Sequence, residues 1–339
     1  MELKDSCLTT GELIDKLQQI WNIHVTKAEV IAESTALCRK IFSEENDYFL
    51  KEFQDSYSQE RARLEGRICK LLLNNRLPVS EIIPSTDGKD YAVIKGRIFQ
   101  LQHYVNGTSP THNSLKVKTL CEASRYLGKI HSTLWLSKLP PLFGDSWISK
   151  FNENESISFY KETQSKVSAM ATDEYTKQKV LCDLDFRITL TKHMDALSKY
   201  FKNLTYTPSH GDYTPSQLIC KGDSIQKIID FSNLHSVPAV LELVRFYYLA
   251  SDDMKCTDCL NSDSLKTYIK TYLEEFKLTN QEIMSIPYVA AYYLGRNRYV
   301  YREYSDTGNI QALKRSAHLT EISRYFYNNA EEISYRLSK

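Results

Sequence analysis

The stretch that most constrains the fold of this chain is residues 209–242, SHGDYTPSQLICKGDSIQKIIDFSNLHSVPAVLE. Residues 218–220 and 225–229 are predicted to form two short strands, joined by a turn with the sequence KGDS. Asp212 precedes the first strand, and Asp230 ends the second strand 18 positions later (230 − 212). The hairpin would therefore hold two carboxylates near each other.

A pair of carboxylates in this arrangement suits phosphoryl transfer. One carboxylate orients the attacking hydroxyl and accepts its proton, while the other holds Mg²⁺ against the phosphates together with a neutral oxygen donor. Asp212 fits the first role and Asp230 the second, and Gln217 can supply an amide oxygen to the metal. A His-x-Asp sequence alone is typical of a surface loop with solvated aspartates, so the prediction depends on the strands between the two acids.

The motifs HGDYTPSQ and IIDFSN resemble those of the aminoglycoside phosphotransferase and choline kinase family, which are small-molecule kinases with a protein-kinase-like fold. The resemblance implies that Asp212 is the catalytic base and that Asp230 binds the metal. It also implies that His210 holds the catalytic loop in shape. Glu242 matches a family acidic position that braces this loop from the following helix.

Two positions depart from the family pattern. Gln217 stands where Asn is usual, although branches that resemble the maltose-type sugar kinases also carry Gln there. Ser232 and Asn233 replace a glycine and an acidic residue, which would remove a second acidic metal ligand. These departures leave an alternative open, a catalytically degenerate kinase-like protein that binds nucleotide or acts as a scaffold.

The bulk properties are those of an ordinary globular protein. Its 339 residues, 42% hydrophobic and 25% charged, suffice for two domains with cores of their own. A net charge of +1 gives no argument for nucleic acid or an anionic membrane as a partner. The first residues lack the apolar core of a signal peptide, and no 18-residue apolar run occurs. We therefore expect a cytoplasmic protein, a monomer or homodimer, without nucleic-acid or membrane partners.

The first hundred residues predict an antiparallel sheet. A helix that includes residues 13–21 comes first, with Thr9 and Glu12 at the spacing of a capping box. Strands are then predicted in six segments and a helix in one. The strands cover residues 25–31, 36–42, 48–53, 79–84, 91–94 and 98–105, and the helix covers 58–74.

Lys51 lies in the middle of the third predicted strand, where a kinase needs a cation to grip the α- and β-phosphates of the nucleotide. The alternative is an ordinary lysine on the solvated face of the strand. Ser34 and Thr35 occupy the turn where a glycine-rich loop would cover the phosphates, and their hydroxyls could donate hydrogen bonds instead.

A half-buried lysine requires a carboxylate partner from the helix over 58–74, because the ammonium would otherwise lose hydration without compensation. Glu60 and Glu65 are both candidates. Five positions at about 100° each place them about 140° apart, so only one can face Lys51. Periodicity does not choose between them. The family resemblance favours Glu65, because RLEGRICKLL is similar to the family glutamate followed seven residues later by leucine.

The last strand of the sheet runs into Asn106 and Gly107, and in a kinase-like chain this junction is the hinge that binds the adenine edge. His103 and Val105 would supply the backbone groups, and Gln102 would border the adenine pocket. A plain transition from strand to loop is the alternative. We expect residues 1–106 to form a nucleotide-binding lobe and residues 107–339 a catalytic and substrate-binding helical lobe.

From residue 114 onward the pattern is helical. Helices are predicted over 115–134, 173–201, 244–250, 264–276, 280–293 and 313–337. His131 is expected to be structural. Arg296, Arg298 and Arg302 interleave with tyrosines, as in some nucleic-acid surfaces. We interpret this run as a helix face whose arginines are solvated or pair with acids, with lining of a substrate pocket as the alternative.

The resemblance thus implies an α+β, bilobal protein-kinase-like fold, with an antiparallel N-terminal sheet, one main helix in that lobe and a mostly helical second lobe. ATP and Mg²⁺ would bind between the lobes, and the γ-phosphate would pass to an acceptor oriented by Asp212. Only 11 residues, 231–241, separate Asp230 from Glu242, too few for the segment on which protein kinases dock peptides. The expected acceptor is a hydroxyl of a small molecule such as an aminoglycoside, a sugar or an amino alcohol.

Overall fold

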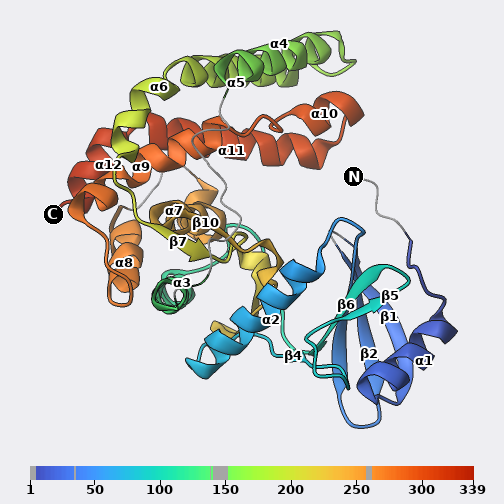
Figure 1. Ribbon diagram of the computed structural model, residues 1–339. Helices are drawn as coiled ribbons and strands as arrows, with labels where there is room; N and C mark the ends of the chain where they lie inside the picture. Colours follow the sequence, from blue (N-terminus) through green and yellow to red (C-terminus); the bar gives the residue numbers. More distant parts are fainter. Residues whose placement is uncertain (1–4, 34–35, 138, 140–151, 257–261) are drawn as a thin grey trace. The chain divides into compact units, whose positions relative to one another are not determined.

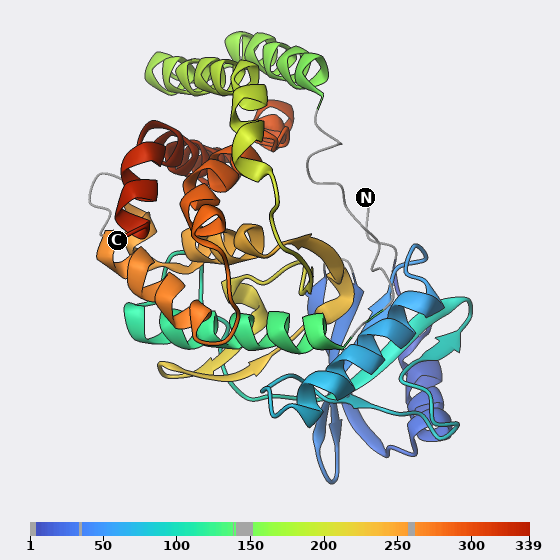
Figure 2. The same cartoon turned by 60° about the vertical axis from the view of Figure 1, so that its left-hand side comes forward.

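The computed structural model describes residues 5–33, 36–137, 139, 152–256 and 262–339. The chain divides into two compact units, which are coloured along the sequence in Figure 1 and turned by 60° in Figure 2. Unit 1 consists of Met1–Pro110 and Ser216–Leu234, and unit 2 of Thr111–Pro215 and His235–Lys339. The hairpin that follows Asp212 therefore groups with the N-terminal sheet, whereas Asp212 itself belongs to unit 2. The division into lobes at residue 106 stays a prediction about domains.

Unit 1 is built on a six-stranded sheet with the order β1-β2-β3-β6-β4, in which β5 also pairs with β6. All of these pairings are antiparallel, as predicted. The strands are β1 (Val25–Glu33), β2 (Ala36–Ser43), β3 (Asp47–Phe53), β4 (Ile82–Ile83), β5 (Ala92–Ile94) and β6 (Arg97–His103). The helices of this part are α1 (Thr10–Trp21) and α2 (Gln59–Asn74).

Both helices begin at caps that the sequence specifies. The Thr9 side chain accepts a hydrogen bond from the backbone of Glu12, and the Glu12 side chain accepts one from the backbone of Thr9, so the predicted capping box of α1 is present. At α2 the side chain of Ser58 accepts a hydrogen bond from the backbone N–H of Arg61.

The alternation of side chains along the central strands assigns each face of the sheet to one helix. Leu50 on β3 packs in a buried cluster with Leu13 and Leu17 of α1. Lys51 has the opposite orientation, because it lies directly across from Cys38 on β2, and Cys38 packs with Ala62 of α2. Lys51 therefore shares the face of the sheet that α2 covers.

The second stretch of unit 1 is hydrogen-bonded to the first. It contains β8 (Leu218–Lys221) and β9 (Ser224–Ile228), an antiparallel pair that follows the short 3₁₀ turn η2 (Pro215–Gln217) and precedes η3 (Phe231–Asn233). On one side, the backbone of Ile228 donates to Pro78 O at 2.7 Å. On the other side, Thr108 and Cys220 exchange backbone hydrogen bonds of 3.0 and 2.9 Å. These contacts tie the hairpin to the segments before and after the sheet.

Unit 2 is mostly helical. A two-stranded antiparallel sheet, β7 (Tyr206–Ser209) with β10 (His235–Pro238), lies at the two points where the chain enters and leaves unit 1. The helical elements are α3 (Val117–Leu136), α4 (Glu153–Ala169), α5 (Glu174–Lys192), α6 (Met194–Leu197), η1 (Ser198–Phe201), α7 (Ala239–Ala250), η4 (Asp252–Lys255), α8 (Ser262–Leu273), α9 (Asn280–Gly295), α10 (Arg302–Thr307), α11 (Ile310–Asn328) and α12 (Ala330–Leu337).

Two of the predicted helices of unit 2 are interrupted. The helix predicted over 173–201 ends at Lys192, and His193 separates it from α6. The helix predicted over 313–337 breaks at Asn329, which caps the end of α11 before α12 begins. In both cases the apolar period continues across the break, so the pattern alone does not show it.

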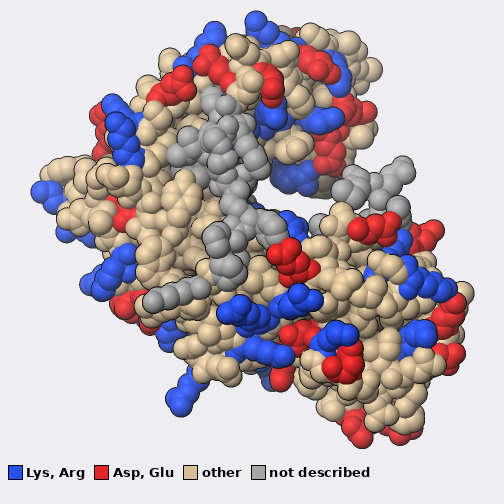
Figure 3. All heavy atoms as spheres, in the orientation of Figure 1, with Lys and Arg blue, Asp and Glu red and all other residues tan. Residues whose placement is uncertain are grey.

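On the face drawn in Figure 3, basic and acidic side chains are interspersed rather than gathered by sign. Of the helices in the described part of the chain, none combines the length and the apolar character needed to cross a bilayer.

Candidate active site

The ammonium of Lys51 lies within reach of two carboxylates in unit 1. Lys51 Nζ is 2.7 Å from Asp230 Oδ1 and 3.7 Å from Glu65 Oε1. The Lys51 side chain is 5% exposed and that of Glu65 is 1% exposed, whereas the Asp230 side chain is 25% exposed. The structure thus brings together three of the predicted site residues, with Asp230 as the member most open to solvent.

The helical period did not distinguish Glu60 from Glu65 as the partner of Lys51, but burial does. Glu65 is on the face of α2 that packs against the sheet, and Glu60 is exposed. The second oxygen of Glu65 accepts a hydrogen bond of 2.9 Å from the hydroxyl of Tyr57. The Tyr57 ring stacks on Phe53 at a centroid distance of 3.9 Å. Tyr57 was not predicted as a site residue, because the loop between β3 and α2 carries no motif that marks it.

The two buried partners influence each other's protonation. Burial lowers the pKa of Lys51, but the carboxylates of Asp230 and Glu65 outweigh this effect and raise its pKa above the usual range. The lysine is therefore held as a cation. Burial raises the pKa of Glu65, and the nearby lysine opposes the increase.

Asp230 has a backbone conformation that suits a short polar residue. Its φ of 65° lies in the left-handed region, which Asp tolerates better than most residues. The turn is closed by Ser232, whose hydroxyl donates to Asp230 Oδ1 at 2.6 Å. Ser232 stands where the family pattern has glycine, and it adds a hydrogen bond to the carboxylate.

Gln217 lies beside Asp230 at the open end of the β8–β9 hairpin. The backbone N–H of Ile229 donates to the carbonyl of Gln217 at 2.9 Å, so the residue before Asp230 is paired directly with Gln217. The hairpin predicted from the sequence is present and holds these two residues near each other, as the pairing of Leu218 with Ile228 requires.

The residues predicted to bind the adenine edge end strand β6. Gln102 is buried and lies opposite Phe49 and Ile82, whereas His103 is exposed and its ring stacks with that of Tyr48 at 5.6 Å. Val105 follows the end of the strand and is half-buried. Ser34 and Thr35, which were expected over the phosphates, lie outside the described residues.

In unit 2 the loop that carries His210 and Asp212 is anchored by helix α7. Glu242 Oε1 accepts the backbone N–H of Gly211 at 2.6 Å, and Oε2 accepts that of His210 at 3.1 Å. His131 Nε2 lies 2.9 Å from the same Oε2. Glu242 therefore braces the loop in the way that the resemblance implied.

The electrostatics of this brace favour a charged Glu242. Burial raises the pKa of Glu242, but its hydrogen bonds with His131 and with the loop outweigh the burial and lower the pKa to about 2. His131 is fully buried, and its Nδ1 lies 2.6 Å from the Tyr272 hydroxyl. These contacts agree with the expected structural role of His131.

The same helix places a cation on Asp212. Arg245 Nη2 lies 2.7 Å from Asp212 Oδ1, and Arg245 follows Glu242 by three positions, so both side chains point to the loop from one face of α7. The sequence analysis missed Arg245. The i, i+3 spacing after the bracing glutamate is the signal that would have identified it, once α7 was known to lie against the loop.

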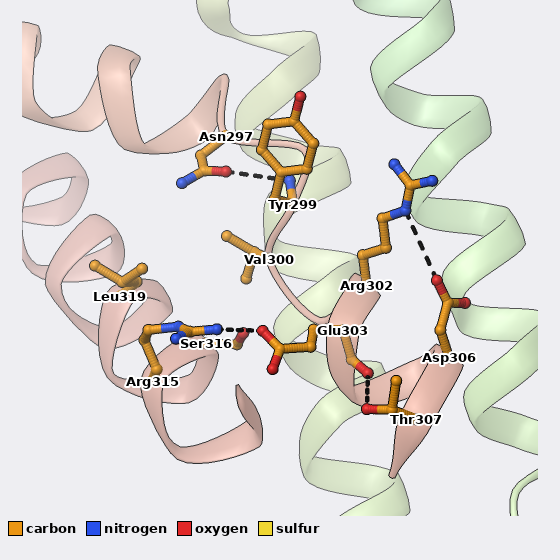
Figure 4. Close-up of a pocket in the computed structure, with 10 residues that line it drawn as sticks. All are labelled: Asn297, Tyr299, Val300, Arg302, Glu303, Asp306, Thr307, Arg315, Ser316 and Leu319. Carbon is orange, nitrogen blue, oxygen red and sulfur yellow. Dashed lines mark hydrogen bonds and ion pairs between the residues drawn. The ribbon is translucent and has the colours of Figure 1, made fainter. Parts of the chain in front are cut away.

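Two residues of the run of arginines and tyrosines after α9, Tyr299 and Arg302, are among those that line a pocket of about 410 Å³ in unit 2. Figure 4 shows Arg302 directed at Asp306 and Arg315 directed at Glu303 within this pocket. Outside the pocket, Arg298 pairs with Glu155 at 2.8 Å. The run is mostly a turn between α9 and α10 rather than a helix face, because Tyr301 has a φ of 66°. The expected helix face is therefore wrong for Arg296 and Arg298, whereas the pairing of Arg298 and Arg302 with acids agrees with the rest of our interpretation.

An antiparallel sheet unit with a buried lysine–carboxylate cluster and a helical unit with a braced HGD loop define an α+β kinase-like protein. Residues 37–257 match the model of the phosphotransferase enzyme family, and the chain belongs to this family. The resemblance, the fold class and the enzyme class predicted from the sequence, a small-molecule phosphotransferase, are thereby confirmed.

Among curated proteins, the chain is 25% identical over 244 residues to a homoserine kinase of Zymomonas mobilis, covering 71% of this chain and 69% of that protein. Among solved structures, it is similar to an aminoglycoside phosphotransferase of Alicyclobacillus acidocaldarius with a TM-score of 0.71, at 11% identity over 98% of both chains. It is also similar to an amicoumacin kinase in complex with AMP-PNP, Ca²⁺ and its ligand, with a TM-score of 0.62 at 14% identity over 97% of this chain and 94% of that chain. These structures support the fold.

Proposed function

We propose that this protein transfers the γ-phosphate of ATP to a hydroxyl of a small molecule. The observation that carries the proposal is the approach of Lys51 to both Asp230 and Glu65, at 2.7 and 3.7 Å, in a chain of the phosphotransferase family. A buried cation with two acids, one of them partly exposed, is the arrangement that phosphate binding with a metal requires.

In this proposal the residues of unit 1 serve the nucleotide. Lys51, held by Glu65, would grip the α- and β-phosphates, and the backbone of His103 and Val105 would contact the adenine edge, beside Gln102. Ser34 and Thr35 are proposed to lie over the phosphates. The solved amicoumacin kinase that the chain resembles holds AMP-PNP, which supports nucleotide use by this fold.

The oxygen donors of unit 1 fit a magnesium ion. Asp230 presents a carboxylate that is 25% exposed, and Gln217 is paired with the neighbouring residue Ile229. Among the described residues no group of three or more histidine, cysteine or acidic side chains could hold a metal by itself. One carboxylate with an amide oxygen suits Mg²⁺, which usually takes one or two protein carboxylates and completes its shell with phosphate and water. When bound, the ion neutralises charge on the transferring phosphate.

Asp212 is proposed as the base that orients the acceptor. Its carboxylate would accept the hydroxyl proton as the acceptor oxygen bonds to the γ-phosphorus, while the bond from that phosphorus to the bridging oxygen breaks and ADP leaves. The brace from Glu242 to Gly211 and His210 fixes the backbone beside Asp212. His210 is fully buried, so we assign it to holding the loop rather than to proton transfer.

The acceptor is proposed to be small. Its class follows from the short stretch between Asp230 and Glu242, which holds η3 and β10 and leads directly into α7. Aminoglycosides, sugars and amino alcohols remain the candidate acceptors. We expect the enzyme to act in the cytoplasm as a monomer or homodimer, without nucleic acid or membrane partners, which cell fractionation and light scattering can check.

Calorimetric titration with ATP in the presence and absence of Mg²⁺, followed by a phosphorylation screen over hydroxylated metabolites and antibiotics, tests the proposal. We expect metal-dependent nucleotide binding and turnover with at least one alcohol. Asp212→Ala should abolish turnover while nucleotide binding is kept. Gln217→Ala should raise the Mg²⁺ concentration needed for half-maximal rate. Gln217→Asn, which keeps an amide oxygen, should raise it less.

One observation favours a second candidate, a catalytically degenerate protein that binds nucleotide or acts as a scaffold. Oδ1 of Asp230 already accepts hydrogen bonds from Lys51 and from Ser232, at 2.7 and 2.6 Å, which leaves this oxygen less available to a metal. The scaffold predicts nucleotide binding without phosphorylation of any alcohol in a broad screen. Turnover that disappears in Asp212→Ala contradicts it.

A further inference from the structure

The ion pair between Asp212 and Arg245 places a positive charge at the expected base. Arg245 Nη2 lies 2.7 Å from Asp212 Oδ1, and the two side chains are 20% and 32% exposed. Both therefore remain partly open to solvent. Asp212 is the residue proposed to contact the acceptor hydroxyl. An acceptor in position for transfer would therefore also lie near the positive charge of Arg245.

Arg245 keeps hydrogen-bonding capacity beyond this pair. A guanidinium carries five N–H donors, and in the described part of the chain the recorded hydrogen bond of Arg245 is the one to Asp212. Burial lowers the pKa of Arg245, but the phenols of Tyr293 and Tyr248 and the carboxylate of Asp212 outweigh it and raise the pKa. The side chain is thus a cation with donors to spare.

Two other arginines of unit 2 show what a purely structural arginine looks like in this fold. Arg187 is fully buried and donates to Thr320 Oγ1 and to the carbonyl of Leu294, so it ties helices together. Arg324 pairs with Asp183, which is buried. Arg245 differs from both, since its partner is a partly exposed carboxylate of the HGD loop.

The negative charges of Asp212 and Glu242 are both compensated within the protein, which disfavours a polycationic acceptor. Arg245 offsets the charge of Asp212, and the charge of Glu242 is taken up by two backbone N–H groups and by the contact with His131. A cationic acceptor would find no uncompensated carboxylate in this group. A carboxylate on the acceptor, in contrast, could bind the remaining N–H donors of Arg245 in the planar geometry that guanidinium groups favour.

We propose that Arg245 selects the acceptor: it binds a carboxylate of a small hydroxylated acid while it holds Asp212 for the hydroxyl of the same molecule. This inference rests on the proposed phosphotransferase function and deepens it. It assigns the acceptor to the hydroxy acids, including hydroxy amino acids, and disfavours polycationic aminoglycosides and quaternary amino alcohols.

Three matched acceptors test the inference. L-Homoserine carries a carboxylate and an amine, 4-hydroxybutyrate carries only the carboxylate, and 3-amino-1-propanol carries only the amine. We expect kcat/KM for the two carboxylates to exceed that for 3-amino-1-propanol by roughly 10- to 100-fold, the range of a charge-assisted hydrogen bond. Arg245→Gln should remove most of this ratio, and Arg245→Lys should keep part of it. Arg324→Gln, which breaks a comparable ion pair elsewhere in unit 2, should leave the ratio unchanged.

Equal or better turnover of 3-amino-1-propanol or kanamycin, or a ratio that Arg245→Gln does not alter, overturns the inference while the phosphotransferase stands. If no acceptor is phosphorylated, the binding affinities of the three acceptors test the inference instead. The three acceptors are then titrated calorimetrically into wild type, Arg245→Gln and Arg245→Lys with AMP-PNP present. Carboxylate-dependent binding that Arg245→Gln loses supports the inference although transfer fails, and equal binding of all three compounds overturns it. Thermal unfolding shows whether each variant is folded. If Arg245→Gln does not fold, Arg245→Lys is compared with wild type instead, and a reduced preference for carboxylates is expected.

Discussion

Lys51 Nζ and Asp230 Oδ1 are 2.7 Å apart although 179 positions separate the two residues in the chain. The ion pair joins the third strand of the sheet to the end of the β8–β9 hairpin, and it is shorter than the 3.7 Å contact between Lys51 and Glu65. If Lys51 grips the phosphates as we propose, a bound nucleotide would compete with Asp230 for the lysine. Substitution of Lys51 tests this role.

Replacement of Lys51 by Met should weaken nucleotide binding strongly. The change removes the cation proposed for the phosphates, so we expect kcat/KM for ATP to fall by about 10²-fold or more. Calorimetric titration with ATP and Mg²⁺ measures the loss in binding. Lys40→Met is the matched control, because Lys40 on β2 also pairs with a carboxylate, that of Asp47, at 2.8 Å. Unchanged affinity in Lys51→Met would refute the phosphate-binding role.

Tyr57→Phe isolates the hydroxyl that supports Glu65. The variant keeps the stacking on Phe53 but removes the 2.9 Å hydrogen bond to Glu65 Oε2. Loss of a donor to a buried carboxylate costs about 1–3 kcal/mol, so we expect a lower unfolding midpoint and a several-fold weaker affinity for ATP. Glu65→Gln and the double variant complete a cycle, and the two effects should not add. Tyr175→Phe, at a phenol that is 80% exposed, is the control.

We expect Glu242 to make a contribution to the free energy of unfolding that is lost at acid pH. Its pKa is about 2 in the folded protein against an ordinary value of 4.5, so folding favours the carboxylate. The stabilisation is fully present above about pH 5 and is lost as the pH falls toward 2, and the shift corresponds to roughly 3 kcal/mol. In urea unfolding, Glu242→Gln should be less stable than wild type by that order at pH 7, and the gap should narrow at acid pH.

The control for Glu242 is Glu303→Gln, which removes a carboxylate that is 47% exposed and pairs with Arg315. Exposed ion pairs contribute less than about 1 kcal/mol, so we expect a small change at all pH values. A gap between wild type and Glu242→Gln that stays constant from pH 7 to pH 3 would contradict a charged brace.

Gly107→Ala should destabilise unit 1. A Cβ at this position would lie 2.6 Å from Ile219 Cγ2 and 2.7 Å from the carbonyl oxygen of Cys220, and the backbone cannot give way as a flexible side chain does. We expect a loss of about 1–3 kcal/mol, typical of overpacking, measured as a lower thermal midpoint. Gly11→Ala is the control, because nothing lies within 4 Å of a Cβ there and alanine favours helix α1.

Features set by neighbouring residues could be predicted from the sequence. The capping box of α1 and the β8–β9 hairpin each depend on a few adjacent positions, and both are present. Lys51 could be singled out from its place in a strand, but its face depends on the register with β2, which brings Cys38 opposite it. The choice between Glu60 and Glu65 likewise required either the family resemblance or the packing of α2.

Features that depend on distant pairs were missed. Glu52 is fully buried and pairs with Arg39 and Arg97, at 2.9 and 2.8 Å, on the face of the sheet opposite Lys51. A glutamate inside a strand predicts exposure unless its partners are known, and here one partner lies on another strand 45 positions away. Arg245 and the β7–β10 pair were missed for the same reason, because their partners are distant in the sequence and are brought together only by folding.

The division of unit 1 into two stretches has a consequence for the synthesis of the protein. The 105 residues from 111 to 215 (215 − 110) leave the ribosome before the hairpin that hydrogen-bonds to Pro78 and Thr108. Until then the sheet lacks these partners, and Lys51 lacks Asp230. A nascent chain halted after Pro110 would therefore carry an incomplete unit 1 in which Lys51 lacks Asp230, a state that chaperones or proteases could recognise.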